Sequence, residues 1–223
     1  IQRILEYRNI ANDGNGATAI TLLEKLKYSS PYDSGYFAFR LNFNIGVIQQ
    51  NLGDYPSAIA SLKAAYAFFP EHYKAQTGLA FAELLEGEDR PAFERAMELL
   101  NHDGDHRSLA ACILCHTARN LSEEFRLEEI ISGELGSLEV KAAFLEYCRV
   151  LRPDTYKCEL DRAYTETPDS DVIATMWASS VLDNARQNQA FLLGAKMLEG
   201  FKAEVEQCAE IFRVDLEKSL IQR

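Results

Sequence analysis

The chain has 223 residues, of which 47% are hydrophobic, and its formal net charge is −11. This length suits one large domain or a short array of repeats, and the hydrophobic content is ample for a buried core. Because neutralising phosphates requires clustered Lys and Arg, the acidic balance predicts that the chain does not bind nucleic acid. A protein or peptide partner is more compatible with this charge.

Cysteine usage and hydropathy bear on the compartment. The five cysteines are an odd number, and several fall within apolar helical patterns, which favours a reducing, cytoplasmic setting over a disulfide scaffold. No signal peptide is recognisable and no apolar run is long enough for a membrane span, so we expect no membrane association. The chain starts at Ile1 without Met and ends within a helical pattern, so we expect a fragment of a longer protein, part of a larger complex.

Residues 43–70 predict a helix, a tight turn and a second helix. The small residues Gly46 and Ala58 stand where the two helices would press together. Gly53 breaks the first helix, and Pro56 opens the second at a position where a missing N–H costs nothing.

The same stretch carries a recognisable spacing of small and aromatic residues. It resembles the tetratricopeptide repeat at Gly46, Gly53, Tyr55, Ala58, Ala65 and Pro70. The resemblance implies an all-α fold, a right-handed α-α superhelix of about five to six helix pairs that binds other proteins.

Copies of this spacing predict the organisation of the chain. An earlier copy repeats the last five members at the same intervals: Gly14, Gly16, Ala19, Leu26 and Pro31. A later copy stands 34 residues onward at Ala80, Gly87, Asp89, Ala92, Leu99 and Gly104. We therefore expect a first repeat and junction at 1–38, two well-formed repeats at 39–106, a degenerate helix pair at 107–136, two divergent repeats at 137–204 and a capping helix at 205–223.

The degenerate pair lacks the small-residue pattern. There we expect a first helix over Leu109–Thr117 and a second over Ser122–Ile131. The six prolines support the register, because all of them fall at a repeat end or beside the turn between two helices: Pro31, Pro70 and Pro168 at ends, and Pro56, Pro91 and Pro153 at turns.

The predicted binding surface is the inner wall formed by the first helix of each repeat. Counting from the small residue of each repeat, the exposed positions are Arg40, Phe43, Asn44, Val47, Asn51, Lys74, Thr77, Phe81 and Leu85. Further along the chain the same rule selects Lys141, Leu145, Arg149, Thr175, Ser179 and Asp183. The alternative is that Phe43, Val47 and Phe81 pack between neighbouring helices, because an apolar residue at helical spacing is often core.

The resemblance also implies a known ligand mode, a clamp of Lys and Asn around the terminal carboxylate of a chaperone peptide. Asn44 and Lys74 match two of its places. Ile4, Arg8 and Gly78 stand where the clamp has Lys, Asn and Arg or Lys, so we predict that it is absent. A peptide ending in Glu-Glu-Val-Asp should then show no carboxylate-dependent binding.

Two further motifs raise cofactor chemistry. Cys112, Cys115 and His116 have the spacing of covalent haem attachment, with zinc as an alternative, but they lie in an apolar stretch typical of a packed helix. Residues 101–106 hold two His and two Asp, which could bind a metal or serve as turn and cap residues. We favour the structural role for both motifs, and predict no cofactor, no metal and no enzymatic activity.

The leading hypothesis for function is a non-enzymatic scaffold that binds a peptide, a helix or a partner subunit. One alternative is a sensor or regulatory region of a larger signalling enzyme or transcriptional regulator. Another follows from a narrower likeness to the polaris family of repeat-rich subunits of the intraflagellar transport B complex, which would imply ciliary transport. That likeness rests on 44–47, 53–61, 74–75 and 87–89.

Overall fold

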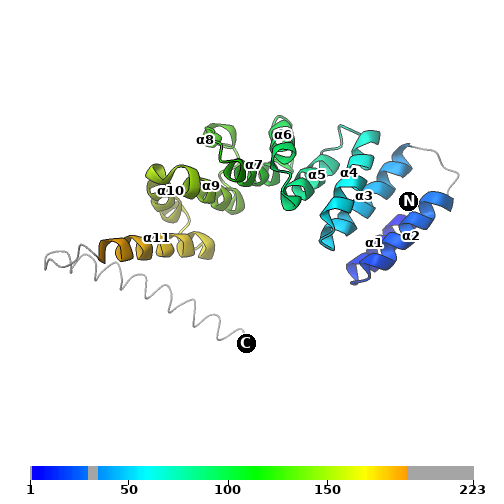
Figure 1. Cartoon of the computed structure of the whole chain (residues 1–223), viewed down its shortest axis with the longest axis horizontal. Helices are drawn as coiled ribbons and strands as arrows, with labels where there is room; N and C mark the ends of the chain where they lie inside the picture. The colour runs from blue at the N-terminus through cyan, green and yellow to red at the C-terminus, as the bar shows by residue number, and fades with distance from the viewer. Residues whose placement is uncertain (1, 30–34, 190–223) are drawn as a thin grey trace. The chain divides into compact units, whose positions relative to one another are not determined.

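The computed structural model describes residues 2–29 and 35–189, and within them it contains eleven helices and no strand (Figure 1). The all-α prediction is therefore confirmed for these residues. The expected capping helix at 205–223 and the end of the last predicted repeat lie outside them. The chain divides into two compact units, 1–147 and 148–223.

The first unit contains nine of the described helices, the last of which crosses the unit boundary. Their bounds are α1 Gln2–Asn12, α2 Gly16–Ser29, α3 Gly35–Asn51, α4 Tyr55–Phe68, α5 Tyr73–Glu86, α6 Asp89–Leu99, α7 Arg107–Leu121, α8 Leu127–Ile130 and α9 Leu138–Leu151. From α1 to α7 each helix packs against the next (Figure 1). In addition α1, α3, α5 and α7 contact one another in succession, so they form one row, which we call the first-helix row.

Four turns of the first unit share one backbone geometry. Each follows a helix of the first-helix row and contains one residue with positive φ: Gly14 (88°), Gly53 (78°), Gly87 (87°) and Ser122 (55°). The next N–H then donates to the carbonyl five residues earlier, as in a Schellman motif. These bonds are Asn15 to Ile10 (3.1 Å), Asp54 to Gln49 (3.0 Å), Glu88 to Glu83 (2.8 Å) and Glu123 to Ala118 (3.2 Å).

Prolines stand at helix boundaries, as predicted. Pro56 is the second residue of α4, where Asp54 caps the helix by accepting from the Ser57 N–H at 3.2 Å. Of the others in the described residues, Pro91 is the third residue of α6, Pro153 is the first of α10 (Pro153–Glu166), and Pro70 and Pro168 follow the ends of α4 and α10. Proline chemistry thus places these helix boundaries locally.

The close approach of α3 and α4 occurs where the small residues predicted it. A Cβ added at Gly46 would lie 2.7 Å from Leu62 Cγ and 3.3 Å from the carbonyl oxygen of Ala58. Ala58 and Leu62 are both fully buried. Glycine is therefore required at position 46 by packing rather than by backbone conformation.

A buried ion pair joins α5 to α6. Glu83 is fully buried, and Arg95 donates to both of its carboxylate oxygens, at 2.9 and 3.2 Å. Lys63 of α4 lies 3.8 Å from the same carboxylate, and the Arg95 guanidinium lies over the Tyr66 ring. One charge cluster therefore joins α4, α5 and α6.

The degenerate pair differs from its prediction. The first helix is present as α7, but the expected second helix over Ser122–Ile131 is reduced to the single turn α8. The left-handed Ser122 ends α7, and the backbone of Phe125 then bonds to the hydroxyl of Tyr147 instead of to a helical neighbour. The prediction was wrong because a tertiary contact with α9 takes up these backbone groups.

The second unit contains α10 and α11 (Asp171–Gln189), which pack against each other. Trp177 stacks on Tyr164 with ring centroids 4.7 Å apart, and its indole N–H donates to Asp161 Oδ1 at 2.9 Å. Trp177 is the only tryptophan of the chain, so its fluorescence reports on this helix pair.

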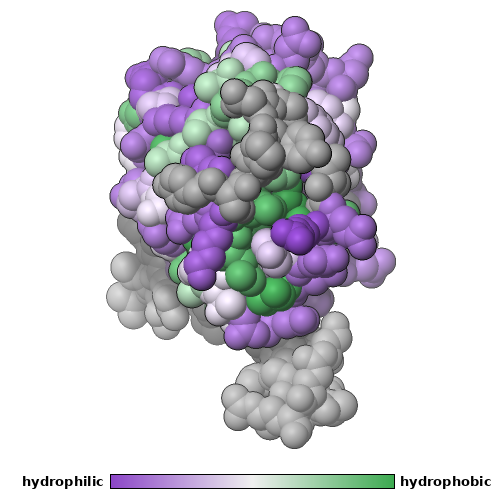
Figure 2. All heavy atoms as spheres, turned by 90° about the vertical axis from the view of Figure 1, so that its right-hand side faces the viewer, coloured by the Kyte–Doolittle hydropathy of each residue, from purple (hydrophilic) through white to green (hydrophobic). Residues whose placement is uncertain are grey.

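The surface seen from the α1 and α2 side carries a hydrophobic area surrounded by hydrophilic residues (Figure 2). Leu5 of α1 is 37% exposed. Partly exposed apolar side chains such as this one are normal in a folded protein. No helix within the described residues is both long and apolar enough to span a membrane.

Candidate protein-binding site

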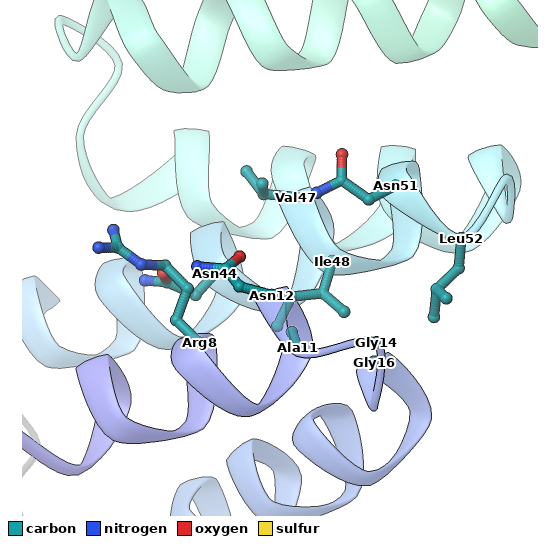
Figure 3. Close-up of a pocket in the computed structure, with 10 residues that line it drawn as sticks. All are labelled: Arg8, Ala11, Asn12, Gly14, Gly16, Asn44, Val47, Ile48, Asn51 and Leu52. Carbon is teal, nitrogen blue, oxygen red and sulfur yellow. The ribbon is translucent and has the colours of Figure 1, made fainter. Parts of the chain in front are cut away.

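A first cleft lies between α1 and α3 and has a volume of about 430 Å³ (Figure 3). Arg8 and Asn12 come from α1, and Ile48 of α3 points toward α1. Leu52, in the turn after α3, points to the same side, and Val47 and Asn51 point to the opposite side. The cleft brings one guanidinium and three side-chain amides together, so it offers both hydrogen-bond donors and acceptors. Its full lining is Arg8, Ala11, Asn12, Gly14, Gly16, Asn44, Val47, Ile48, Asn51 and Leu52.

A second cleft, which we call the central groove, has a volume of about 320 Å³. It runs along α5 and takes walls from α3, from the turn before α7 and from α7 itself. Three predicted binding residues, Lys74, Thr77 and Phe81, line it together. The full lining is Gln50, Tyr73, Lys74, Thr77, Gly78, Phe81, Asp105, His106 and Leu109.

Two predicted binding residues are less exposed than expected. Asn44 is 4% exposed and its Nδ2 donates to the Arg40 carbonyl at 2.6 Å. Thr77 is 7% exposed and its hydroxyl donates to the Tyr73 carbonyl at 2.7 Å. The expectation of exposure was wrong because the first helices pack side by side, so that positions on their flanks are covered by the neighbouring helix.

The remaining predicted residues line neither cleft. Phe43 stacks on Phe39 at 5.8 Å and packs against buried residues, as the core alternative requires. Arg40 is half-buried and its Nε lacks a hydrogen-bond partner. Leu85 is 42% exposed on the last turn of α5.

The positions predicted further along the chain lie on α9 and α11. Leu145 is 1% exposed, so the prediction that it belongs to a surface was wrong. It lies on the buried side of α9, together with Phe144 and Cys148. The others are exposed or half-exposed: Lys141, Arg149, Thr175, Ser179 and Asp183.

A continuous series of ring contacts crosses the first-helix row, and the binding-surface prediction missed most of it. It begins with Phe39 on α3, whose ring lies 4.5 Å from that of His72. Tyr73 follows, stacked on His106 at 4.6 Å. Phe39 to Tyr73 and His72 to His106 are both separated by 34 residues, the repeat interval, which is the signal that could have found it.

His72 occupies the start of α5 between two predicted binding residues. Burial lowers the pKa of His72, and the charges of Lys74 and Arg40 lower it further, against a raising effect of its backbone hydrogen bond. The imidazole is therefore held in its neutral form to lower pH than usual.

A third cleft, of about 600 Å³, lies between the junction of α4 with α5 and the turn after α6. Glu71, Glu98 and Asp103 give it an acidic lining beside the rings of Tyr66 and Tyr73. From the sequence, Asp103 was expected only as a turn or metal residue, because the cleft forms only where the junction of α4 with α5 meets the turn after α6.

The two motifs considered for cofactor binding lie on α7 and in the turn between α6 and α7. Burial raises the pKa of the Cys112 thiol and lowers that of His116, while Cys115 is fully buried on α7. His106 places its Nε2 3.1 Å from the Leu99 carbonyl, at the turn between α6 and α7. Within residues 2–29 and 35–189, no three His, Cys, Asp or Glu side chains gather as a metal site.

Comparison of the chain with models of protein families gives no match, and neither does comparison with curated proteins.

Proposed function

We propose that this chain is a non-enzymatic scaffold that binds an extended peptide, or a partner subunit presenting one, along the first-helix row of a TPR-like right-handed superhelix. The partner would lie across α1, α3, α5 and α7. The sequence resemblance to the tetratricopeptide repeat motivates the superhelix, and two local observations support it.

The first observation is the repetition of the same turn after four successive helices of the row, with equivalent hydrogen bonds in each. The second is that alternate helices contact one another while consecutive helices pair. In helical-repeat proteins this combination aligns one helix of each pair along a shared wall, which is the surface that such proteins use for binding.

The observation that carries the proposal is the placement of the predicted residues in clefts of this wall. Val47 and Asn51 line the first cleft, and Lys74 and Phe81 line the central groove. Both clefts mix amide or charged groups with apolar ones. This mixture suits a peptide, whose backbone needs hydrogen bonds and whose side chains need apolar contact.

The test selects binders from a phage-displayed library of random peptides against the whole chain, followed by affinity measurement with synthetic peptides. The double variant Asn51→Arg, Lys74→Glu should weaken binding by roughly tenfold or more, about 1.4 kcal/mol per factor of ten. Both side chains are exposed, so the fold should be unaffected.

The matched control is Ala60→Arg, an exposed position on α4, which is not a helix of the first-helix row. It should leave the affinity unchanged. The proposal is wrong if no peptide is selected, or if Ala60→Arg abolishes binding while the double variant does not.

A further inference from the structure

The central groove contains two buried polar atoms that have no hydrogen-bond partner. One is Nε2 of Gln50 on α3, and the other is Nδ1 of His106 at the start of α7. His106 itself is 6% exposed. Because a buried polar atom without a partner costs free energy, such atoms are rare, and two that line one groove call for a common explanation.

The two atoms differ in the hydrogen bond that each can form. The side-chain N–H of Gln50 is a donor. His106 has its Nε2 3.1 Å from the Leu99 carbonyl, which can only accept, so Nε2 carries the proton and Nδ1 of the neutral ring is an acceptor. A Cβ at Gly104 would lie 2.8 Å from Nδ1, so a larger residue at that position would collide with the imidazole.

The rest of the groove is mainly apolar, with one charge of each sign. Phe81 and Leu109 supply apolar walls, and Leu109 is 41% exposed. Lys74 and Asp105 are both exposed. An anion would meet Asp105 and the acceptor of His106, and a cation would meet Lys74 and the donor of Gln50, so the groove is complementary to neither.

We propose that the central groove seats one apolar residue of an extended partner polypeptide, with a backbone carbonyl accepting from Gln50 Nε2 and a backbone N–H donating to His106 Nδ1. A peptide group is the common ligand that offers one donor and one acceptor without net charge. The volume of about 320 Å³ is at the small end of ligand pockets, which fits one or two residues. This inference rests on the proposed function and names the chemistry of its central contact.

The test uses the tightest synthetic peptide from the random library and the whole chain carrying Gln50→Leu. If the Gln50 amide serves the partner, this change should raise the thermal midpoint, because an unpartnered buried group is removed, and lower the affinity at least tenfold. If Gln50 had only a structural role, Gln50→Leu would leave the affinity unchanged.

The control is Gln49→Leu, at the neighbouring position, whose Oε1 already accepts from the Ser61 hydroxyl at 2.7 Å. It should lower the thermal midpoint and leave the affinity unchanged. A second arm scans the peptide by N-methylation, and one methylated amide, next to the essential apolar residue, should lose binding to the wild-type chain.

The outcomes separate the two proposals. If no peptide is selected, the proposed function fails and this inference fails with it. If peptides bind and Asn51→Arg, Lys74→Glu weakens them, but Gln50→Leu and every N-methyl variant bind as the parent does, the function stands and the assignment of the central groove is wrong.

Discussion

The hydroxyl of Tyr147 forms two hydrogen bonds with the backbone of one residue, Phe125. It accepts from the Phe125 N–H at 2.9 Å and donates to the Phe125 carbonyl at 2.8 Å. Tyr147 is fully buried on α9. One side chain thereby satisfies the irregular segment that stands in place of the expected second helix after α7.

Tyr147→Phe should destabilise the chain by about 1–3 kcal/mol, because it leaves a partly buried N–H and carbonyl without this partner. Urea denaturation followed by circular dichroism measures the change. Tyr36→Phe is the control: Tyr36 is 47% exposed, and its replacement should alter the free energy of unfolding by less than about 0.5 kcal/mol. Equal effects of the two changes would contradict the role given to Tyr147.

Gly46→Ala and Gly78→Ala should change the free energy of unfolding in opposite directions, although both new methyl groups face Leu62. At Gly46 the methyl would lie 2.7 Å from Leu62 Cγ, and overpacking should outweigh the gain in helix propensity, for a net loss of about 1–2 kcal/mol. At Gly78 the nearest atom is 3.7 Å away, so propensity prevails and stability should rise by up to about 1 kcal/mol. A stabilising Gly46→Ala would show that Leu62 moves aside freely.

Ser122→Gly should stabilise the chain by about 0.5–1 kcal/mol, since Ser122 adopts the left-handed conformation that Gly adopts at the three equivalent turns. The reverse comparison is Gly87→Ala, where open space surrounds the new methyl and only backbone strain acts. It should cost about 1 kcal/mol. Thermal unfolding of both variants tests the shared turn geometry, and a destabilising Ser122→Gly would refute it.

Stability should fall as the pH drops below the unfolded histidine pKa near 6.5, since burial lowers the folded pKa of His72 and His116. Below that pH the unfolded chain binds protons that the folded chain does not, so this stability is complete above 6.5 and is lost toward the folded pKa values. The double variant His72→Gln, His116→Gln should show a shallower loss between about pH 7.5 and 5.5 in urea titrations. An unchanged slope would assign the loss to other groups.

The candidate site was predicted in part. Counting along the repeat found Val47, Asn51, Lys74 and Phe81, because residues on one helix face recur at helical spacing. It missed Gln50, His106 and Leu109, which enter the central groove only because α3, α5 and α7 lie next to each other. Asn44 and Thr77 were placed on an open face that the neighbouring helices cover.

The sequence by itself determined several helix boundaries of the first unit. Gly53, Gly87, Pro56 and Pro91 act through their own backbone restrictions, so their effects are local and are readable without a fold. Tertiary structure alone decided the short α8, because the hydroxyl that replaces its helical hydrogen bonds belongs to Tyr147, 22 residues from Phe125. It also decided that Gln50 Nε2 and His106 Nδ1 lack hydrogen-bond partners, since burial depends on which helices meet and not on the residues beside them.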